Sequence, residues 1–178
     1  MSTLKVNNIA GVSGGTSPPI TLSGDTATLG SVVTFPAGMI IGVENTTTTT
    51  IVAKNNTTYE TVISDSITVK ANSKVLINVS IPIAANTDST PAGGQILQTG
   101  TASATIMAAR EVMDEHHASS GGYFGGTFMS GVLSTAGSYT FSFQGNRLSG
   151  SGTVYFVSAN PGTGSASIAT MTLYEIAG

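Results

Sequence analysis

Residues 74–83, which read Lys-Val-Leu-Ile-Asn-Val-Ser-Ile-Pro-Ile, decide the fold. Apolar side chains occupy every second position of this stretch, namely Val75, Ile77, Val79, Ile81 and Ile83. Successive side chains of a β-strand point to opposite faces of its sheet, so a period of two predicts a strand with one buried face. We therefore expect a β-sheet whose inner side is lined by these residues.

The same alternation appears elsewhere along the chain. Tyr139, Phe141 and Phe143 alternate with small polar residues, which again predicts a half-buried strand. The sequence does not decide the secondary structure of residues 102–112, because their alanines permit a helix while their flanks favour a strand. With short loops between the strands, the chain offers about eight strands, a usual number for a jelly roll of two sheets. We predict an all-β, jelly-roll β-sandwich.

The first part of the chain differs in composition from the rest. Residues 1–31 are dense in Gly, Pro, Ser and Thr, which forbids a long helix and cannot supply a core of its own. The short alternation at Leu4 and Val6 is enough for one strand, which would need a partner from elsewhere. We expect an extended N-terminal attachment arm over residues 1–31 and a jelly-roll knob domain over residues 32–178.

Composition excludes several classes of function. Only 8% of the residues are charged, against about 25% in a typical soluble domain. Charged residues are depleted in the cores of protein interfaces, so this shortage favours assembly. Six Lys and Arg residues, with a net charge of −3, offer no basic cluster for nucleic acid. No stretch approaches the ~18 apolar residues of a membrane span or resembles a signal peptide, so we expect no membrane insertion.

The last strands look apolar on both faces. Val154 and Phe156 alternate with Tyr155 and Val157, and further on Ile168 and Ile176 face away from Met171 and Leu173. One face of a sandwich strand fills the core and the other normally meets water, so a second apolar face needs a cover. We predict a homotrimer whose interface includes Tyr155, Val157, Met171 and Leu173.

The densest group of ionisable residues lies between Arg110 and His117. Asp114 or Glu115 together with His116 and His117 would supply metal ligands, but neighbours on a strand point to opposite faces. The H-E-x-x-H spacing of helical zinc sites is absent. A symmetric trimer would gather three copies of one histidine, which keeps this weak metal alternative open. A solvated loop at the tip of the sandwich is the favoured interpretation, and no cofactor is expected.

A hydrolase site finds little support in the sequence. Asp114 and Glu115 are sequence neighbours, whereas a glycosidase needs two carboxyl groups that oppose each other across a cleft. The chain has no cysteine and no G-x-S-x-G nucleophile motif. Tyr123, Phe124 and Phe128 would suit stacking on sugars, although such residues more often belong to a core or an interface. We expect no enzymatic activity.

Four short segments resemble a family of phage virion proteins, the small tail fibres. They are residues 2–9 (STLKVNNI), 33–40 (VTFPAGMI), 73–80 (SKVLINVS) and 171–176 (MTLYEI). They span nearly the whole chain, and none is catalytic. The resemblance implies a trimeric jelly roll similar to C1q or tumour-necrosis-factor heads, located in the virion.

The resemblance also implies roles for residues at the two ends of the molecule. The opening segment, with Leu4, Val6 and Ile9, would attach to another virion protein. The knob would contact a host surface glycan or protein through a loop that comprises Asp114, Glu115, His116, His117 and Tyr123.

Two alternatives to a tail fibre stay open. The chain lacks the long shaft of a fibre, and residues 110–117 do not resemble any segment of the tail-fibre family. A capsid decoration protein, or head fibre, would use the same arm and the same burial between chains to clamp capsid subunits. A C1q-like adhesin or a glycan hydrolase is the alternative from a different class.

Overall fold

The structure is a computed structural model that describes residues 8–9, 20–23, 26–29, 35–87, 90–113, 121–158 and 166–178. The chain separates into two units, Met1–Pro36 and Ala37–Gly178. The sequence-based boundary falls between residues 31 and 32, a few residues earlier.

Short strands of the first unit pair with one another. An antiparallel sheet joins β1 (Asn8–Ile9), β2 (Ile20–Ser23) and β3 (Thr26–Leu29), in that order. Leu4 and Val6 lie outside the described residues.

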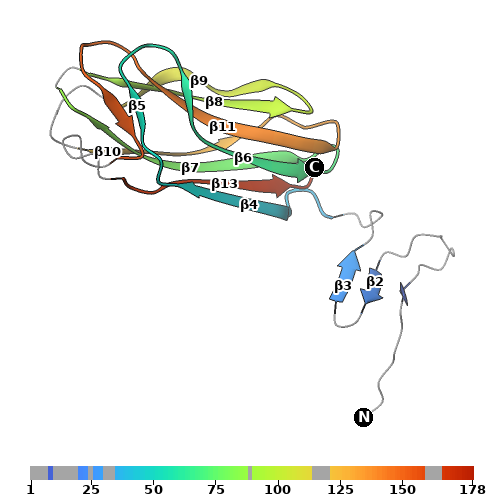
Figure 1. Ribbon diagram of the computed structural model, residues 1–178. Coiled ribbons are helices and arrows are strands. Elements are labelled where there is room, and N and C mark those ends of the chain that lie inside the picture. The colour runs from blue at the N-terminus through green and yellow to red at the C-terminus, as the bar shows by residue number, and fades with distance from the viewer. Residues whose placement is uncertain are drawn as a thin grey trace. The chain divides into compact units, whose positions relative to one another are not determined.

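The second unit is a sandwich of two antiparallel sheets (Figure 1). The first sheet contains β4 (Ile40–Thr48), β13 (Ala169–Ile176), β7 (Lys74–Ala85) and β10 (Gly122–Met129). Short strands β5 (Val52–Lys54) and β12 (Val154–Phe156) extend this sheet along the second half of β7. The second sheet contains β6 (Glu60–Val69), β11 (Gly137–Arg147), β8 (Ala92–Gly100) and β9 (Ala104–Met113).

The long strands pair in a nested order. Along the chain, the first long strand pairs with the last, β4 with β13, and the second with the one before last, β6 with β11. Inside these pairs, β7 joins β10 and β8 joins β9. This wrapping produces a jelly roll, so the predicted all-β jelly-roll sandwich is confirmed. Residues 104–113 are a strand, which decides the question that the sequence left open.

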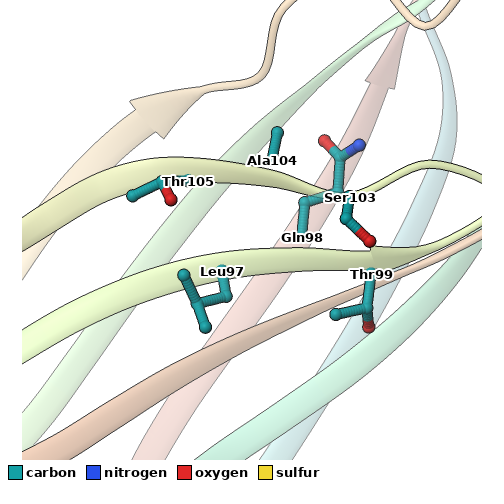
Figure 2. Close-up of a pocket in the computed structure, with 6 residues that line it drawn as sticks. All are labelled: Leu97, Gln98, Thr99, Ser103, Ala104 and Thr105. Atoms are coloured by element: carbon teal, nitrogen blue, oxygen red, sulfur yellow. The ribbon is translucent and has the colours of Figure 1, made fainter.

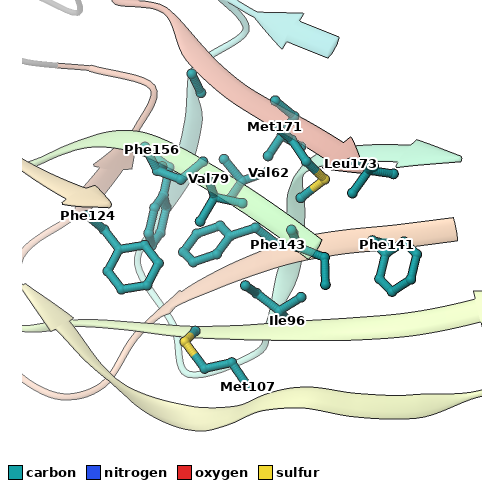
Figure 3. Close-up of a cluster of buried hydrophobic side chains, with 14 of the residues drawn as sticks. Val62, Val79, Ile96, Met107, Phe124, Phe141, Phe143, Phe156, Met171 and Leu173 are labelled. Carbon is teal, nitrogen blue, oxygen red and sulfur yellow. The ribbon is translucent and has the colours of Figure 1, made fainter. Parts of the chain in front are cut away.

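The core lies between the two sheets. All apolar members of the alternation in β7, from Val75 to Ile83, are at most 1% exposed, as the sequence predicts. The rings of Phe124, Phe143 and Phe156 follow one another through the core, with centroids 5.3 Å and 6.2 Å apart (Figure 3). These contacts join β10 and β12 of the first sheet to β11 of the second.

A bulge in β6 changes which of its residues face the core. The register with β11 shifts between Phe143 and Gln144, so that Val62 is an extra residue on β6. Val62 and Ile63 are both buried although they are consecutive, because a bulge interrupts the alternation of side chains.

Three of the predicted interface residues belong to the core of a single chain. Val157, Met171 and Leu173 are fully buried, so the prediction that they contact another subunit is wrong. Met171 and Leu173 point inward from β13. Val157 follows the end of β12 with φ of 65°, which breaks the alternation and turns its side chain inside. Tyr155 is half-buried.

Candidate functional site

The outer face of the first sheet carries an apolar patch. Met129, Leu76, Tyr174 and Val43 stand opposite one another on β10, β7, β13 and β4, so their side chains form one row across four strands. Val43 is 54% exposed and Met129 is 49% exposed, which places this row at the surface.

A second apolar row adjoins the first. Ile176 of β13 stands opposite Lys74 of β7 and Ile40 of β4, and Ile40 is also largely exposed. Lys74 is charged, and the other six residues of the two rows are apolar or aromatic. We call these six residues the apolar patch: Ile40, Val43, Leu76, Met129, Tyr174 and Ile176. Side chains of this kind on neighbouring strands form a continuous apolar surface, as at protein interfaces.

The rest of this face is polar and almost free of charge. Asn45 donates from Nδ2 to Oγ1 of Thr172 at 2.7 Å, and Asn78 donates to Oγ1 of Thr127 at 3.4 Å. The next row along contains Gly125, Ser80, Thr170 and Thr47. In the four rows that run from Lys74 to Ser80, Lys74 is the one charged residue. Such a surface can be covered without burying an unpaired charge.

Strand register places the two ends of the sandwich. At one end, which we call the proximal end, the chain enters at Ala37 and β13 finishes at Ile176. At the opposite, distal end, β7 finishes at Ala85 and β10 begins at Gly122. The apolar patch is at the proximal end of its sheet. Because Met113 pairs with Ala92 at the start of β8, β9 also ends at the distal end.

Of the predicted host-contact residues, the structure describes Tyr123, which lies at the distal end. Tyr123 is 67% exposed at the start of β10. Asp114, Glu115, His116 and His117 lie outside the described residues. The predicted attachment residue Ile9 belongs to β1 of the first unit. Within the described part of the sandwich, Tyr123 and the apolar patch therefore lie at opposite ends of the sheet.

Ionisable groups do not form a reaction centre in the described part of the chain. There, no group of three or more His, Cys, Asp and Glu side chains is arranged to hold a metal ion. Lys54, which is buried, donates to Glu60 at 2.9 Å, a structural ion pair. Burial raises the pKa of Tyr59 above its ordinary value, which keeps its hydroxyl protonated at neutral pH. The described residues also contain no helix that is long and apolar enough to cross a membrane.

The sequence contained a signal for the apolar patch that the alternation argument did not use. Leu76 and Tyr174 occupy the outward positions of strands whose inward positions were recognised correctly. Only the pairing of β7 with β13 and β10 shows that Leu76 lies between Tyr174 and Met129. Single outward apolar residues are common, and their alignment into one row depends on strand order.

Comparison with known proteins gives likeness of fold alone. The sequence matches no protein-family model and no curated protein. The VP2 subviral particle of infectious bursal disease virus is 13% identical, with a TM-score of 0.46 over 90% of this chain and 42% of its own. The structure of the Gx strain of that virus is 14% identical, with a TM-score of 0.43 over 90% and 42%.

A third structure gives a similar result. T=1 particles derived from the same virus are 13% identical, with a TM-score of 0.47 over 90% of this chain and 40% of theirs. This chain spans about two-fifths of the length of these viral chains.

Proposed function

We propose that this protein is a non-enzymatic structural component of a virus particle that assembles into a homotrimer through the outer face of the β4–β13–β7–β10 sheet. The first unit would attach it to another virion protein. The distal end of the sandwich would contact the host surface, in the manner of a short tail fibre.

The observation that carries the proposal is the apolar patch on a sheet face with a single charged residue, Lys74, in the rows from Lys74 to Ser80. A single chain leaves Ile40, Val43 and Met129 about half exposed. A second copy is the best occupant, because in the rows from Lys74 to Ser80 this face offers a single charged group, Lys74, to steer a partner of opposite charge. The polar row beside the patch already hydrogen-bonds within the face, which lowers the cost of removing it from water. The proposal that the assembly contains three copies of the chain is based on the resemblance to the small tail fibres.

The relation between the two ends supports the proposed orientation. Ala37 connects the first unit to the proximal end, whereas Tyr123 lies at the distal end. A protein held through its first unit would therefore present the distal end. Many weak contacts there would be multiplied by the number of copies.

The mass of the full chain in dilute solution tests the assembly. Sedimentation equilibrium should give three times the 17.9 kDa of one chain. A mass of one chain at micromolar concentration would refute the homotrimer. Gold-labelled antibody on intact particles then tests the location: label at the tail supports the tail fibre, and label over the head supports the capsid decoration alternative. Absence of the protein from purified particles would refute the virion role.

A further inference from the structure

A cavity of about 210 Å³ lies where the turn between β8 and β9 meets the segment between β10 and β11. Its lining comes from the second sheet and from the segment between β10 and β11, and it includes Gln98, Ser103, Val132, Ser134, Thr135 and Tyr139. A shallower hollow of about 310 Å³ adjoins it along the same hairpin, and the two share Gln98, Ser103 and Ala104 (Figure 2). Both lie at the proximal end of the sandwich.

Gln98 brings a polar side chain into this cavity from the inner side of β8. In Figure 2 its amide points away from Leu97 and Thr99, its neighbours on the strand. The residue is only 4% exposed. Its Nε2 donates to the carbonyl oxygen of Ala102 at 3.1 Å. That contact fixes the orientation of the amide, because the flipped amide would place two acceptor oxygens together.

The other half of this amide has no partner among the described residues. Oε1 of Gln98 is buried and accepts no hydrogen bond. A buried acceptor without a donor is destabilising, and most such groups in proteins are satisfied. Because Gln98 lines a cavity, a donor can arrive from outside the chain, as a hydroxyl or amide group of a ligand.

The remaining lining defines the chemistry of that ligand. Ser103, Ser134 and Thr135 carry hydroxyl groups, whereas Val132, which is 59% exposed, offers apolar surface. No charged side chain lines either hollow. The Tyr139 hydroxyl donates to the carbonyl oxygen of Thr135 at 2.8 Å, which holds that segment in place before a ligand binds.

We propose that this cavity binds one unit of a neutral saccharide. A sugar ring has a hydroxyl edge and a C–H face, which match the hydroxyl-lined and apolar walls. One hydroxyl would donate to Oε1 of Gln98. Pockets for drug-sized ligands occupy about 300–1,000 Å³, so the smaller cavity suits a single ring and the adjoining hollow leaves room for the chain that continues from it. The proposal requires neither the virion role nor a particular oligomeric state.

Titration of the isotope-labelled full chain with neutral sugars, followed by amide chemical shifts, tests the proposal. The probes are the methyl glycosides of glucose, mannose and galactose and free N-acetylglucosamine, with N-acetylneuraminic acid as a charged comparison. At least one neutral sugar should saturate with a millimolar dissociation constant. The shifted resonances should include the side-chain amide of Gln98 and the backbone amides of Ser103 and Ser134.

Two variants assign the binding to the cavity. Gln98→Met keeps the shape of the side chain and removes the acceptor, so affinity should fall about tenfold. Gln95→Met is the matched control on the same strand, because Gln95 donates to Gln144 at 2.7 Å and lines neither hollow. Ser134→Val, on an exposed segment, tests the opposite wall if Gln98→Met does not fold, and should also weaken binding.

Several results would overturn the proposal. One is the absence of a saturable response to every neutral sugar, which would leave water as the donor to Gln98. Another is unchanged affinity in the folded Gln98→Met variant, or in Ser134→Val. Tighter binding of the charged sugar than of any neutral one would also contradict the assigned class of ligand.

Discussion

The carboxylate of Glu175 accepts a hydrogen bond at 2.7 Å from the hydroxyl group of Ser73, 102 residues earlier in the chain. The same oxygen accepts from the backbone N–H of Lys70 at 2.6 Å. Glu175 is buried near the end of β13, and its side chain ties the turn between β6 and β7 to the last strand. One charged acceptor thus serves donors of a turn that connects the two sheets.

Replacement of Glu175 by Ala should lower the free energy of unfolding by about 1.5–3 kcal/mol, because hydrogen bonds to a charged group are lost in a buried place. Glu175→Gln retains one acceptor oxygen and should lose less. Urea unfolding measures both. Glu44→Gln, at an exposed position of β4, is the control and should change stability by less than about 0.5 kcal/mol. Equal stability of Glu175→Ala and wild type would show that these bonds contribute nothing.

Val43→Lys should separate the proposed trimer without unfolding the chain. Val43 is exposed on the outer face, so a lysine is tolerated in one chain but places a charge inside the interface. Sedimentation should then give the mass of one chain. Thr68→Lys, at an exposed position of β6 in the other sheet, is the matched control and should remain trimeric. A trimeric Val43→Lys protein would place the interface elsewhere.

Gly145→Ala should destabilise the sandwich by about 1–3 kcal/mol, as overpacking of a core does. A Cβ atom at Gly145 would collide with the ring of Phe156. Thermal unfolding should show a lower transition temperature, and adding Phe156→Leu should recover part of the loss. Gly125→Ala is the control, since its nearest contact would be the carbonyl oxygen of Val79 at an ordinary 3.8 Å. Additive losses in the double variant would contradict the contact.

Arg110 covers the aromatic rings at the side where β9 faces β10. Its guanidinium carbon lies 5.7 Å from the ring centre of Phe124 and 5.8 Å from that of Phe128. Arg110→Ala should cost about 0.5–2 kcal/mol and increase the binding of a hydrophobic dye, because the rings lose their cover. Arg110→Lys should lose less, whereas Glu111→Ala, at the exposed neighbouring position, should behave as wild type. Unchanged dye binding in Arg110→Ala would refute the covering role.

The period of two sufficed to predict the fold class and most of the core. It identified the buried residues from Val75 to Ile83 and from Tyr139 to Phe143 correctly. Each of these sets lies on one continuous strand, β7 or β11, in which inward and outward side chains alternate regularly. Alternation is a local property, so a regular strand shows it in the sequence alone.

The faces of the last strands were harder to assign. The pattern correctly placed Met171 and Leu173 opposite Ile176 and Ile168, but we assigned Met171 and Leu173 to a subunit interface, whereas they face the core. Thr170 and Thr172 give the outer side a partly polar character. Their pairing with Thr47 and Asn45 becomes visible only when β13 is placed beside β4.

The cavity at Gln98 was beyond prediction from the sequence for a related reason. Gln98 occupies an inward position at the end of β8, where an apolar residue is the usual expectation. Its role depends on Ala102, across the hairpin, and on Thr135 and Tyr139 from a distant part of the chain. The sequence provides no measure of such distances.

The position of β13 between β4 and β7 also determines when the molecule can fold. Contacting residues such as Asn45 and Met171 are 126 positions apart, so β4 leaves the ribosome long before its partner exists. Sheets that depend on such distant contacts form slowly, and their unpaired strands are prone to aggregate in the meantime. Premature termination before β13 would therefore yield an insoluble fragment, and slower synthesis at low temperature should raise the yield of native protein.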